Sequence, residues 1–393
     1  MTPGESQSGG NRERGHPVRP PRVLRISHSG VVTSWRERER ILRRRGVDLT
    51  LVTANRWSEG GAPVPFAASG DEFVVPVRTF GSHPNLFVFD PRPLWRLLGD
   101  DRWDLVDLHE EPFGLAVGEF LVMRWLRRRR IPYLVSSAQN LDKRYPPPFR
   151  WIERRSLSGA AGAYTCNTEA GVILRRKGLS GELELLPLGV DVDRFRPVVR
   201  EPPTQRLRIG FVGRLVPVKG AHVLLAAAAL DGRLDVDVYG AGPEGIRLEA
   251  QAVALGVSGR VTFHGHVDES VLPDVMPNFD VLAVPSIPVP GSLEQFGRAV
   301  VEAQASGVPS VASASGALPD VVGDAGLLVE PGDPAALCAA LARVLDEPGL
   351  WSRLRDSGLH SVERFSWAGV AGLQEDLYRR AILRSEISLD GRR

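Results

Sequence analysis

The chain has 393 residues, of which 43% are hydrophobic and 24% charged, and its formal net charge at pH 7 is +2. This length exceeds one ordinary hydrophobic core and predicts two domains of roughly 170 to 200 residues each. No apolar run has transmembrane length. Residues 1–20 are rich in Gly, Pro and Arg and lack an apolar signal segment, so they predict a disordered tail and a cytoplasmic protein. Cys166 and Cys338 are too far apart in sequence to suggest a zinc cluster.

The first half of the chain alternates short apolar runs with helical patterns. A strand is expected at 22–27, a charged helix at 33–45 and a second strand at 48–53. Further strands are expected at 73–77, 105–109, 132–136, 162–166 and 183–186. This alternation predicts a parallel, doubly wound α/β sheet. A Pro-rich stretch at 196–206 follows and predicts a linker after a first domain of residues 21–195.

The second half repeats the same alternation. Strands are expected at 207–214, 235–239, 261–264, 281–285, 309–312 and 326–329, with helices between them. They predict a second doubly wound sheet in a domain of residues 207–366. The last segment, 367–393, begins with a helical pattern that continues to residue 383.

Two glutamates eight residues apart, Glu294 and Glu302, flank Phe296-Gly297 in the second half. The pattern predicts an acidic loop, a glycine, an amphipathic helix ending at Gly307 and then a buried strand. In an open α/β sheet, ligands bind at the carboxyl ends of the strands. Both carboxylates are therefore expected to face a ligand there.

A second motif, 213–220, follows a predicted strand and precedes a helix rich in alanine and leucine. It contains Arg214 and Lys219, and Lys219 is one of only three lysines in the chain. Two cations on a loop at a helix N-terminus can converge on a diphosphate, because the helix dipole also attracts anions.

The Gly240-x-Gly242 pair after another strand is not a dinucleotide fingerprint, because Pro243 interrupts the turn and the third glycine is misplaced. Neither Asp191-Val192-Asp193 nor Asp235-Val236-Asp237 is expected to bind a metal, since each has a better structural interpretation.

Together these motifs resemble glycosyltransferases of family 4, which have the GT-B fold. The resemblance runs from Arg22 to about Leu383, and it rests on E-x7-E at Glu294, G-R-L-x-x-x-K-G at Gly213, V-x-G-x-G-P at Val238 and F-x-G-x-V at Phe263. It implies two Rossmann-like domains facing a central cleft, with a C-terminal helix crossing back to the first domain. The first domain would bind the acceptor and the second a nucleotide sugar.

The resemblance also implies roles for single residues. Glu294 would hold sugar hydroxyls and Glu302 the ribose, while Arg214 and Lys219 would neutralise the leaving diphosphate. The remaining donor-binding residues would be Gly213, Gly240, Gly242, His266, Gln295, Phe296 and Gly297. His264 and His266 are equally well interpreted as ordinary turn residues.

The first domain departs from the family pattern. Where relatives have Gly-Gly after the first strand, only Gly30 is available to approach a phosphate. Where many relatives carry a histidine after the fourth strand, this chain has Gln139 and Asn140, which can bind an acceptor but cannot act as a base. His109 is the best remaining imidazole for the cleft, and a purely structural role is the alternative.

The sequence thus predicts a retaining, metal-independent transferase that moves a sugar from a UDP- or GDP-sugar to a hydroxyl of a glycan, glycolipid or small metabolite. No cofactor and no nucleic-acid partner is expected. A nucleotide-sugar epimerase or hydrolase, or a catalytically silent donor-binding subunit, is the alternative. Two basic runs, Arg36 to Arg45 and Arg124 to Arg130, are either solvated helix faces or contacts to anionic lipid at the inner face of a membrane.

Overall fold

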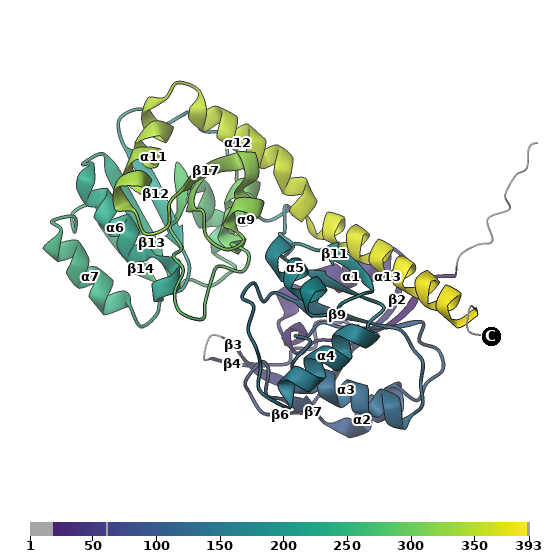
Figure 1. The fold of residues 1–393 in the computed structure, drawn as a ribbon. Helices are drawn as coiled ribbons and strands as arrows, with labels where there is room; N and C mark the ends of the chain where they lie inside the picture. The colour runs from purple at the N-terminus through teal and green to yellow at the C-terminus, as the bar shows by residue number, and fades with distance from the viewer. Residues whose placement is uncertain (1–18, 60–61, 391–393) are drawn as a thin grey trace, which may run out of the picture.

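The computed structural model describes residues 19–59 and 62–390, which form two α/β domains (Figure 1). The sheet of the first domain has seven strands, in the spatial order β11 (Glu182–Leu185), β10 (Gly162–Thr165), β9 (Tyr133–Ser137), β8 (Leu105–Leu108), β1 (Arg22–Ile26), β2 (Asp48–Ala54) and β5 (Val74–Val77). The sheet of the second domain has six, in the order β14 (Val261–Gly265), β13 (Leu234–Tyr239), β12 (Leu207–Val212), β15 (Val281–Val284), β16 (Ser310–Ser313) and β17 (Gly326–Val329). All neighbouring strands in both sheets are parallel, which confirms the predicted fold class.

Helices cover both faces of each sheet. Those of the first domain are α1 (Glu37–Arg44), α2 (Pro91–Leu97), α3 (Leu115–Leu126), α4 (Phe149–Gly159) and α5 (Thr168–Arg176). The second domain contains α6 (Ala221–Leu230), α7 (Gly245–Ala254), α8 (Leu272–Val275), α9 (Arg298–Ala305), α10 (Leu318–Val322), α11 (Pro334–Asp346) and α12 (Leu350–Ser361). Because helices flank the sheets, the central strands β8 and β9 are buried along their whole length.

Short elements differ from the sequence-based expectation. The helix expected at 33–45 begins with a 3-10 turn, Thr33–Arg36, and becomes α-helical only at Glu37. Two antiparallel pairs were not predicted: β3 (Arg56–Glu59) with β4 (Ala62–Pro65), and β6 (Thr79–Phe80) with β7 (Val88–Phe89). They have too few residues for an alternating pattern to be read from the sequence.

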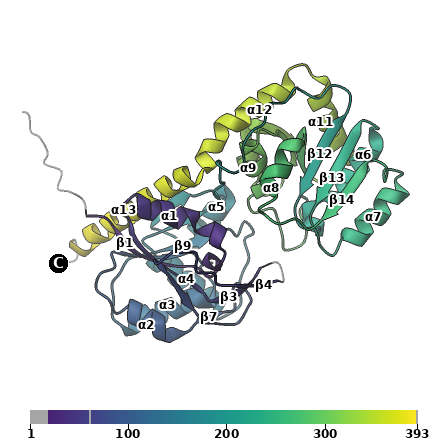
Figure 2. The same cartoon turned by 180° about the vertical axis from the view of Figure 1, so that it is seen from behind.

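The last helix, α13 (Trp367–Asp390), leaves the second domain and lies along the first, as Figures 1 and 2 show. Its residues Tyr378 and Ala381 are fully buried in a core cluster with Val23 and Leu42 of the first domain. The predicted crossing of the C-terminal helix is therefore confirmed. In the part of the chain that the structure describes, no helix is both long and apolar enough to cross a membrane.

A buried carboxylate, Asp107 at the centre of the first sheet, joins this helix to the strands. It contacts the guanidinium of Arg25 on β1 and accepts hydrogen bonds from Tyr164 on β10 (2.9 Å) and Tyr378 on α13 (2.5 Å). Arg25 also pairs with Glu39 on α1, with 2.7 Å between Nε and the carboxylate. A buried charge is tolerated only when it is paired and hydrogen-bonded, so this network fixes the relative positions of β1, β8, β10, α1 and α13.

The first basic run divides into buried arginines near its start and exposed ones, Arg43 to Arg45, at its end. Arg36 and Arg38 are buried, and Arg36 donates to the carbonyl of Gly30 (2.6 Å) and lies 3.3 Å from Asp71. Arg45 pairs with Glu375 of α13 at 2.6 Å. Arg36 holds elements of the first domain together and Arg45 joins that domain to α13, while the expected lipid contact through 36–45 stays a prediction.

Replacement of Tyr378 by Phe should lower the free energy of unfolding by about 1.5 to 3 kcal/mol, because it removes a hydrogen bond to a buried carboxylate. Chemical denaturation followed by circular dichroism measures the change. Tyr239→Phe is the matched control: Tyr239 is half-buried and its hydroxyl has no hydrogen-bond partner in residues 19–59 and 62–390, so its change should stay within about 0.5 kcal/mol. Equal losses in the two variants would contradict a stabilising role for the Asp107 network.

Candidate active site

The acidic loop lies between β15 and α9, at the carboxyl edge of the second sheet. Glu294 on this loop is 8% exposed, and Glu302 lies within α9, 5% exposed. Gly297 caps the helix with a left-handed φ of 89°, and a Cβ there would lie 2.6 Å from the side chain of Leu318. Only glycine fits this turn without strain, so the glycine fixes how the chain enters α9.

Lys219 and Glu294 come together although 75 residues separate them in sequence. Nζ of Lys219 lies 2.7 Å from Oε2 of Glu294, which also accepts a hydrogen bond of 2.9 Å from Ser286. Lys219 ends a 3-10 turn (Pro217–Lys219) just before α6. Arg214, on the same loop, is exposed and makes no ion pair with any residue that the structure describes. The two predicted cations therefore share the loop next to Glu294.

The glycines of this edge allow two loops to pack backbone against backbone. Gly240 follows β13, and a Cβ on it would lie 1.8 Å from the carbonyl oxygen of Gly213. The amide of Gly213 donates to the carbonyl of Tyr239 at 3.0 Å, and that of Leu215 to Ala241 at 3.0 Å. Packing thus requires glycine at Gly240 and also at Gly242, where a Cβ would lie 2.4 Å from the carbonyl oxygen of Leu215, whereas a Cβ on Gly213 would meet only Lys219 at 3.9 Å. The contact of all three glycines with a donor stays a prediction.

Glu302 is held by its own helix. Nε of Arg298, four residues earlier, lies 3.0 Å from Glu302, and its Nη1 lies 3.4 Å from Glu269. Burial raises the pKa of Glu302 to about 7, although Arg298 opposes the shift. A carboxyl group with this pKa exists in both protonation states near neutrality.

A cavity of about 450 Å³ lies at the carboxyl ends of the central strands of the first sheet. His28, His109, Glu110 and Glu111 line it from the first domain, and Gln295 and Arg298 line it from the second. The cavity therefore lies between the domains and reaches the start of α9.

The hydrogen bonds of His109 determine its tautomer. Its Nδ1 lies 2.9 Å from the hydroxyl of Tyr164, which gives its single proton to Asp107 and accepts from Arg25 at 3.1 Å. Nδ1 must therefore carry the imidazole proton, and Nε2 holds a free electron pair. Burial, and then the charge of Arg25, lower the pKa of His109 well below its ordinary value, so the ring stays neutral.

Two carboxylates beside His109 were missed as site residues. Glu110 accepts from the amide and ring of His28, both at 2.7 Å. Glu111 accepts from Ser137 (2.7 Å) and the amide of Ala138 (2.9 Å), and burial raises its pKa to about 7. Both follow His109 directly in the sequence, and this adjacency could have identified them as site residues.

The first domain holds the acidic loop through backbone carbonyls. Asn140 donates to the carbonyl of Glu294 at 2.7 Å, Asn167 to that of Gln295 at 2.9 Å, and Lys143 to that of Gly291 at 3.0 Å. Asn140 is therefore a bridge between the domains. The side chain of Gln139 accepts from the amide of Leu141, and neither Gln139 nor Asn140 lines the cavity.

The remaining predicted site residues lie around the cavity and the acidic loop. Gly30 lines the cavity, but its amide donates to Ser27 within a turn. Gln295 is exposed, whereas Phe296 is buried against Phe365. His266 is exposed after β14, while the neighbouring ring of His264 stacks on Tyr239 and bonds Asp237. In the described residues, no three His, Cys, Asp or Glu side chains are grouped as metal ligands.

Comparison with known proteins gives concordant matches. Residues 193–360 match the family model described as glycosyl transferases group 1, and residues 29–189 match the glycosyl transferase 4-like domain. A D-inositol 3-phosphate glycosyltransferase of Streptomyces bingchenggensis is 34% identical over 317 residues, which cover 71% of this chain and 67% of that protein. An MMP alpha-(1->4)-mannosyltransferase of Mycolicibacterium hassiacum is 38% identical over 211 residues, 52% of this chain and 49% of the relative.

Solved structures share the fold over nearly the whole chain. Sucrose-phosphate synthase from Thermosynechococcus elongatus superposes with a TM-score of 0.67 at 21% identity, covering 93% of this chain and 100% of that one. Anabaena HepE in complex with UDP-glucose gives a TM-score of 0.66 at 16% identity, covering 91% and 99%. With the family models and the inositol phosphate relatives, these matches show that the chain belongs to the GT-B glycosyltransferases of the family 4 type.

Proposed function

We propose that this protein transfers a sugar from a nucleoside diphosphate sugar to a hydroxyl group, with retention at the anomeric carbon. The observation that carries the proposal is the 2.7 Å contact between Lys219 and Glu294, with Arg214 on the same loop. A group for phosphate and a group for sugar hydroxyls thus lie side by side. That is the arrangement needed where a sugar and a diphosphate are joined.

The second domain supplies the donor site in this proposal. Arg214 and Lys219 bind the diphosphate, and the amides of Gly297 and Arg298 at the start of α9, which have no partner within the described ranges, add a second donor group for it. Glu294 orients the sugar and Glu302 the ribose. The bond from the anomeric carbon to the phosphate oxygen breaks as the acceptor oxygen bonds on the same face, and the departing phosphate takes the acceptor proton.

The two side-chain cations supply the charge that a divalent metal supplies elsewhere. As the glycosidic bond breaks, negative charge grows on the diphosphate, and preorganised positive groups stabilise it most in a dry site. We therefore propose that transfer needs no metal. Anabaena HepE is solved with UDP and UDP-glucose, and both UDP- and GDP-sugars remain candidate donors here.

The interdomain cavity is proposed to take the acceptor. Nε2 of His109 accepts a hydrogen bond from an acceptor hydroxyl, and Glu110 and Glu111 accept from its neighbours. The arginines that line the cavity, Arg25, Arg38 and Arg298, all pair with carboxylates. This lining favours a polyhydroxy acceptor without a phosphate group, in contrast to the inositol 3-phosphate for which the Streptomyces relatives are named.

Arg214→Ala and Lys219→Ala should each lower turnover on the order of a hundredfold, because each removes charge stabilisation that is strongest as the diphosphate leaves. The assay measures sugar transfer in excess EDTA, since no metal is needed. Arg247→Ala, an arginine on α7 paired with Glu244, is the matched control and should leave turnover unchanged. Near-normal activity in both loop variants would overturn the donor site.

Glu302→Gln and Glu294→Gln should separate binding of ribose from binding of sugar. If Glu302 binds ribose, its variant weakens the free nucleoside diphosphate and the full donor by a similar factor. If Glu294 binds the sugar, its variant leaves nucleoside diphosphate affinity almost intact and lowers turnover. Titration calorimetry with product and donor measures both. Equal loss of product affinity in the two variants would show that Glu294 is misplaced.

His109→Gln should raise the KM for the acceptor at least tenfold while leaving slow hydrolysis of the donor unchanged, because only the acceptor contacts Nε2. Tyr164→Phe should cause a smaller rise, since it frees the ring to adopt either tautomer. Steady-state kinetics with and without acceptor separates these effects. A parallel loss of donor hydrolysis in His109→Gln would argue for a structural role. Donor hydrolysis that matched transfer in rate would instead favour a hydrolase.

A further inference from the structure

Exposed aromatic and aliphatic side chains gather on α3 and α4, away from the active site. Trp125 and Trp151 are 71% and 65% exposed, and Leu126 and Val122 on α3 are 54% and 55% exposed. The two helices pack side by side, with the side chain of Ile152 against Gly118. Two solvent-exposed tryptophans with aliphatic neighbours on one pair of helices mark an interaction surface.

Arginines without acidic partners surround these side chains. No ion pair within the described residues involves the five exposed arginines Arg128, Arg130, Arg150, Arg154 and Arg155. The segment 121–131 contains no acidic residue, and the single acidic residue of α4, Glu153, is buried and bound to Lys177 at 2.7 Å. By contrast, exposed arginines on α11 and α12, Arg343 and Arg353, pair with Glu347.

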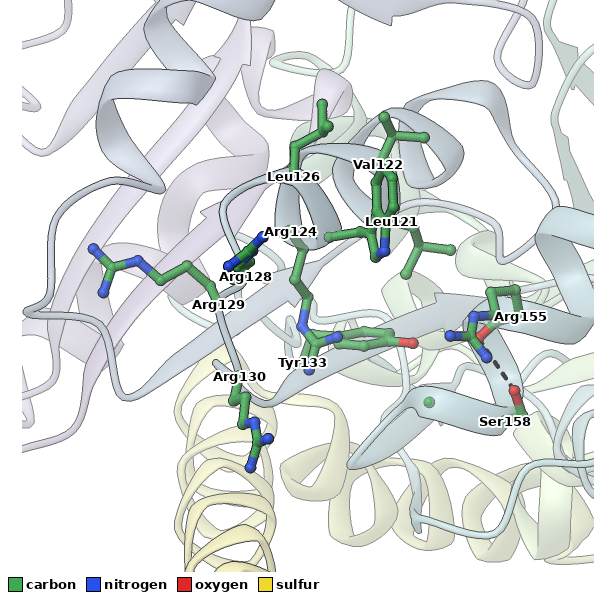
Figure 3. Close-up of a pocket in the computed structure, with 12 residues that line it drawn as sticks. Leu121, Val122, Arg124, Leu126, Arg128, Arg129, Arg130, Tyr133, Arg155 and Ser158 are labelled. Atoms are coloured by element: carbon green, nitrogen blue, oxygen red, sulfur yellow. Dashed lines mark hydrogen bonds between the residues drawn. The ribbon is translucent and has the colours of Figure 1, made fainter.

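A groove with a cavity volume of about 830 Å³ runs between the carboxyl ends of the two helices. Figure 3 shows Arg155 of α4 on one side of this groove, Arg128 and Arg129 on the other, and Tyr133 between them. Leu121 and Val122 of α3 form its apolar wall. The groove therefore combines guanidinium groups, which recognise phosphate, with an apolar lining.

We propose that this α3–α4 face binds the surface of an anionic lipid bilayer. Tryptophan and leucine side chains enter the boundary between headgroups and acyl chains, and the surrounding arginines pair with lipid phosphates and neutralise the surface charge. A nucleic acid would match the arginines but leave Val122 and Leu126 in water. A folded protein partner would have to supply a carboxylate for each of the five unpaired arginines that it buried, whereas lipid phosphates are present in excess at an anionic bilayer surface.

The position of the face fits this role. In Figures 1 and 2, α3 and α4 lie on the side of the first domain that is turned away from the second domain and from α13. Docking there leaves the interdomain cavity and the donor loops uncovered. The catalytic residues therefore take no part in the contact, and this inference is independent of the proposed reaction.

The test is sedimentation of the intact protein with vesicles, at physiological salt. Vesicles of phosphatidylcholine with a third phosphatidylglycerol should bind the protein, and pure phosphatidylcholine should not. Replacing Arg128, Arg154 and Arg155 together by Gln should lower the partition coefficient on the order of a hundredfold, because each basic residue near such a surface contributes about fivefold. Trp125→Gln should lower it further, by loss of apolar insertion.

Arg247, Arg343 and Arg353, replaced together by Gln, form the matched control, since they remove the same charge from comparably exposed helix positions of the second domain. This control should retain vesicle binding. Thermal unfolding and sugar transfer should match the parent protein in all variants. Absence of binding to anionic vesicles, or an equal loss in the control, would overturn the proposal. Binding of a single-stranded RNA oligonucleotide that depends on the same arginines, without vesicle binding, would also overturn it and assign the face to nucleic acid.

Discussion

The carboxylate of Asp107 is fully buried, so neighbouring elements of the protein must supply the groups that stabilise its charge. Arg25, Tyr164 and Tyr378 do so from two strands and the last helix. Removal of one partner from such a cluster leaves an uncompensated buried charge, which is costly. The network therefore holds α13 in register on the first sheet. Through the hydroxyl of Tyr164 it also fixes which nitrogen of His109 carries a proton.

The strands could be predicted from the sequence because parallel strands buried on both faces are almost continuously apolar. The run that became β15 (Val281–Val284), in which every residue is apolar, shows this clearly. The same reasoning failed at the β3–β4 and β6–β7 pairs, which are short and lie outside the main sheets. It also failed for Arg36 and Arg38, which are buried. A helix with many charges predicts an exposed face, and only the fold reveals that Arg36 is enclosed between a turn and Asp71.

The site residues of the second domain were easier to predict from the sequence than the site residues of the first domain. Its residues belong to local motifs, each at the end of one strand, so the order of the chain already places Arg214 and Lys219 on one loop and Glu294 on another. The meeting of Lys219 with Glu294 depends on the adjacency of β12 and β15, which the sequence does not state. In the first domain, the cavity is assembled from the ends of five strands, β1, β8, β9, β10 and β11. The roles of Glu110, Glu111 and Tyr164 there depend on contacts between residues distant in sequence, such as His28 with Glu110.

The bridge between the domains has an evolutionary consequence. Asn140, Lys143 and Asn167 all donate to main-chain carbonyls of the acidic loop, and in the described part of the chain their hydrogen bonds to that loop reach no side chain. Every amino acid presents the same carbonyl, so a substitution at Gln295 that admits a different sugar would leave the bridge intact. The contact between the domains and the side chains of the acidic loop are thus under separate selection. Descendants of this protein can therefore change the sugar that they transfer without changing the residues that connect the two domains.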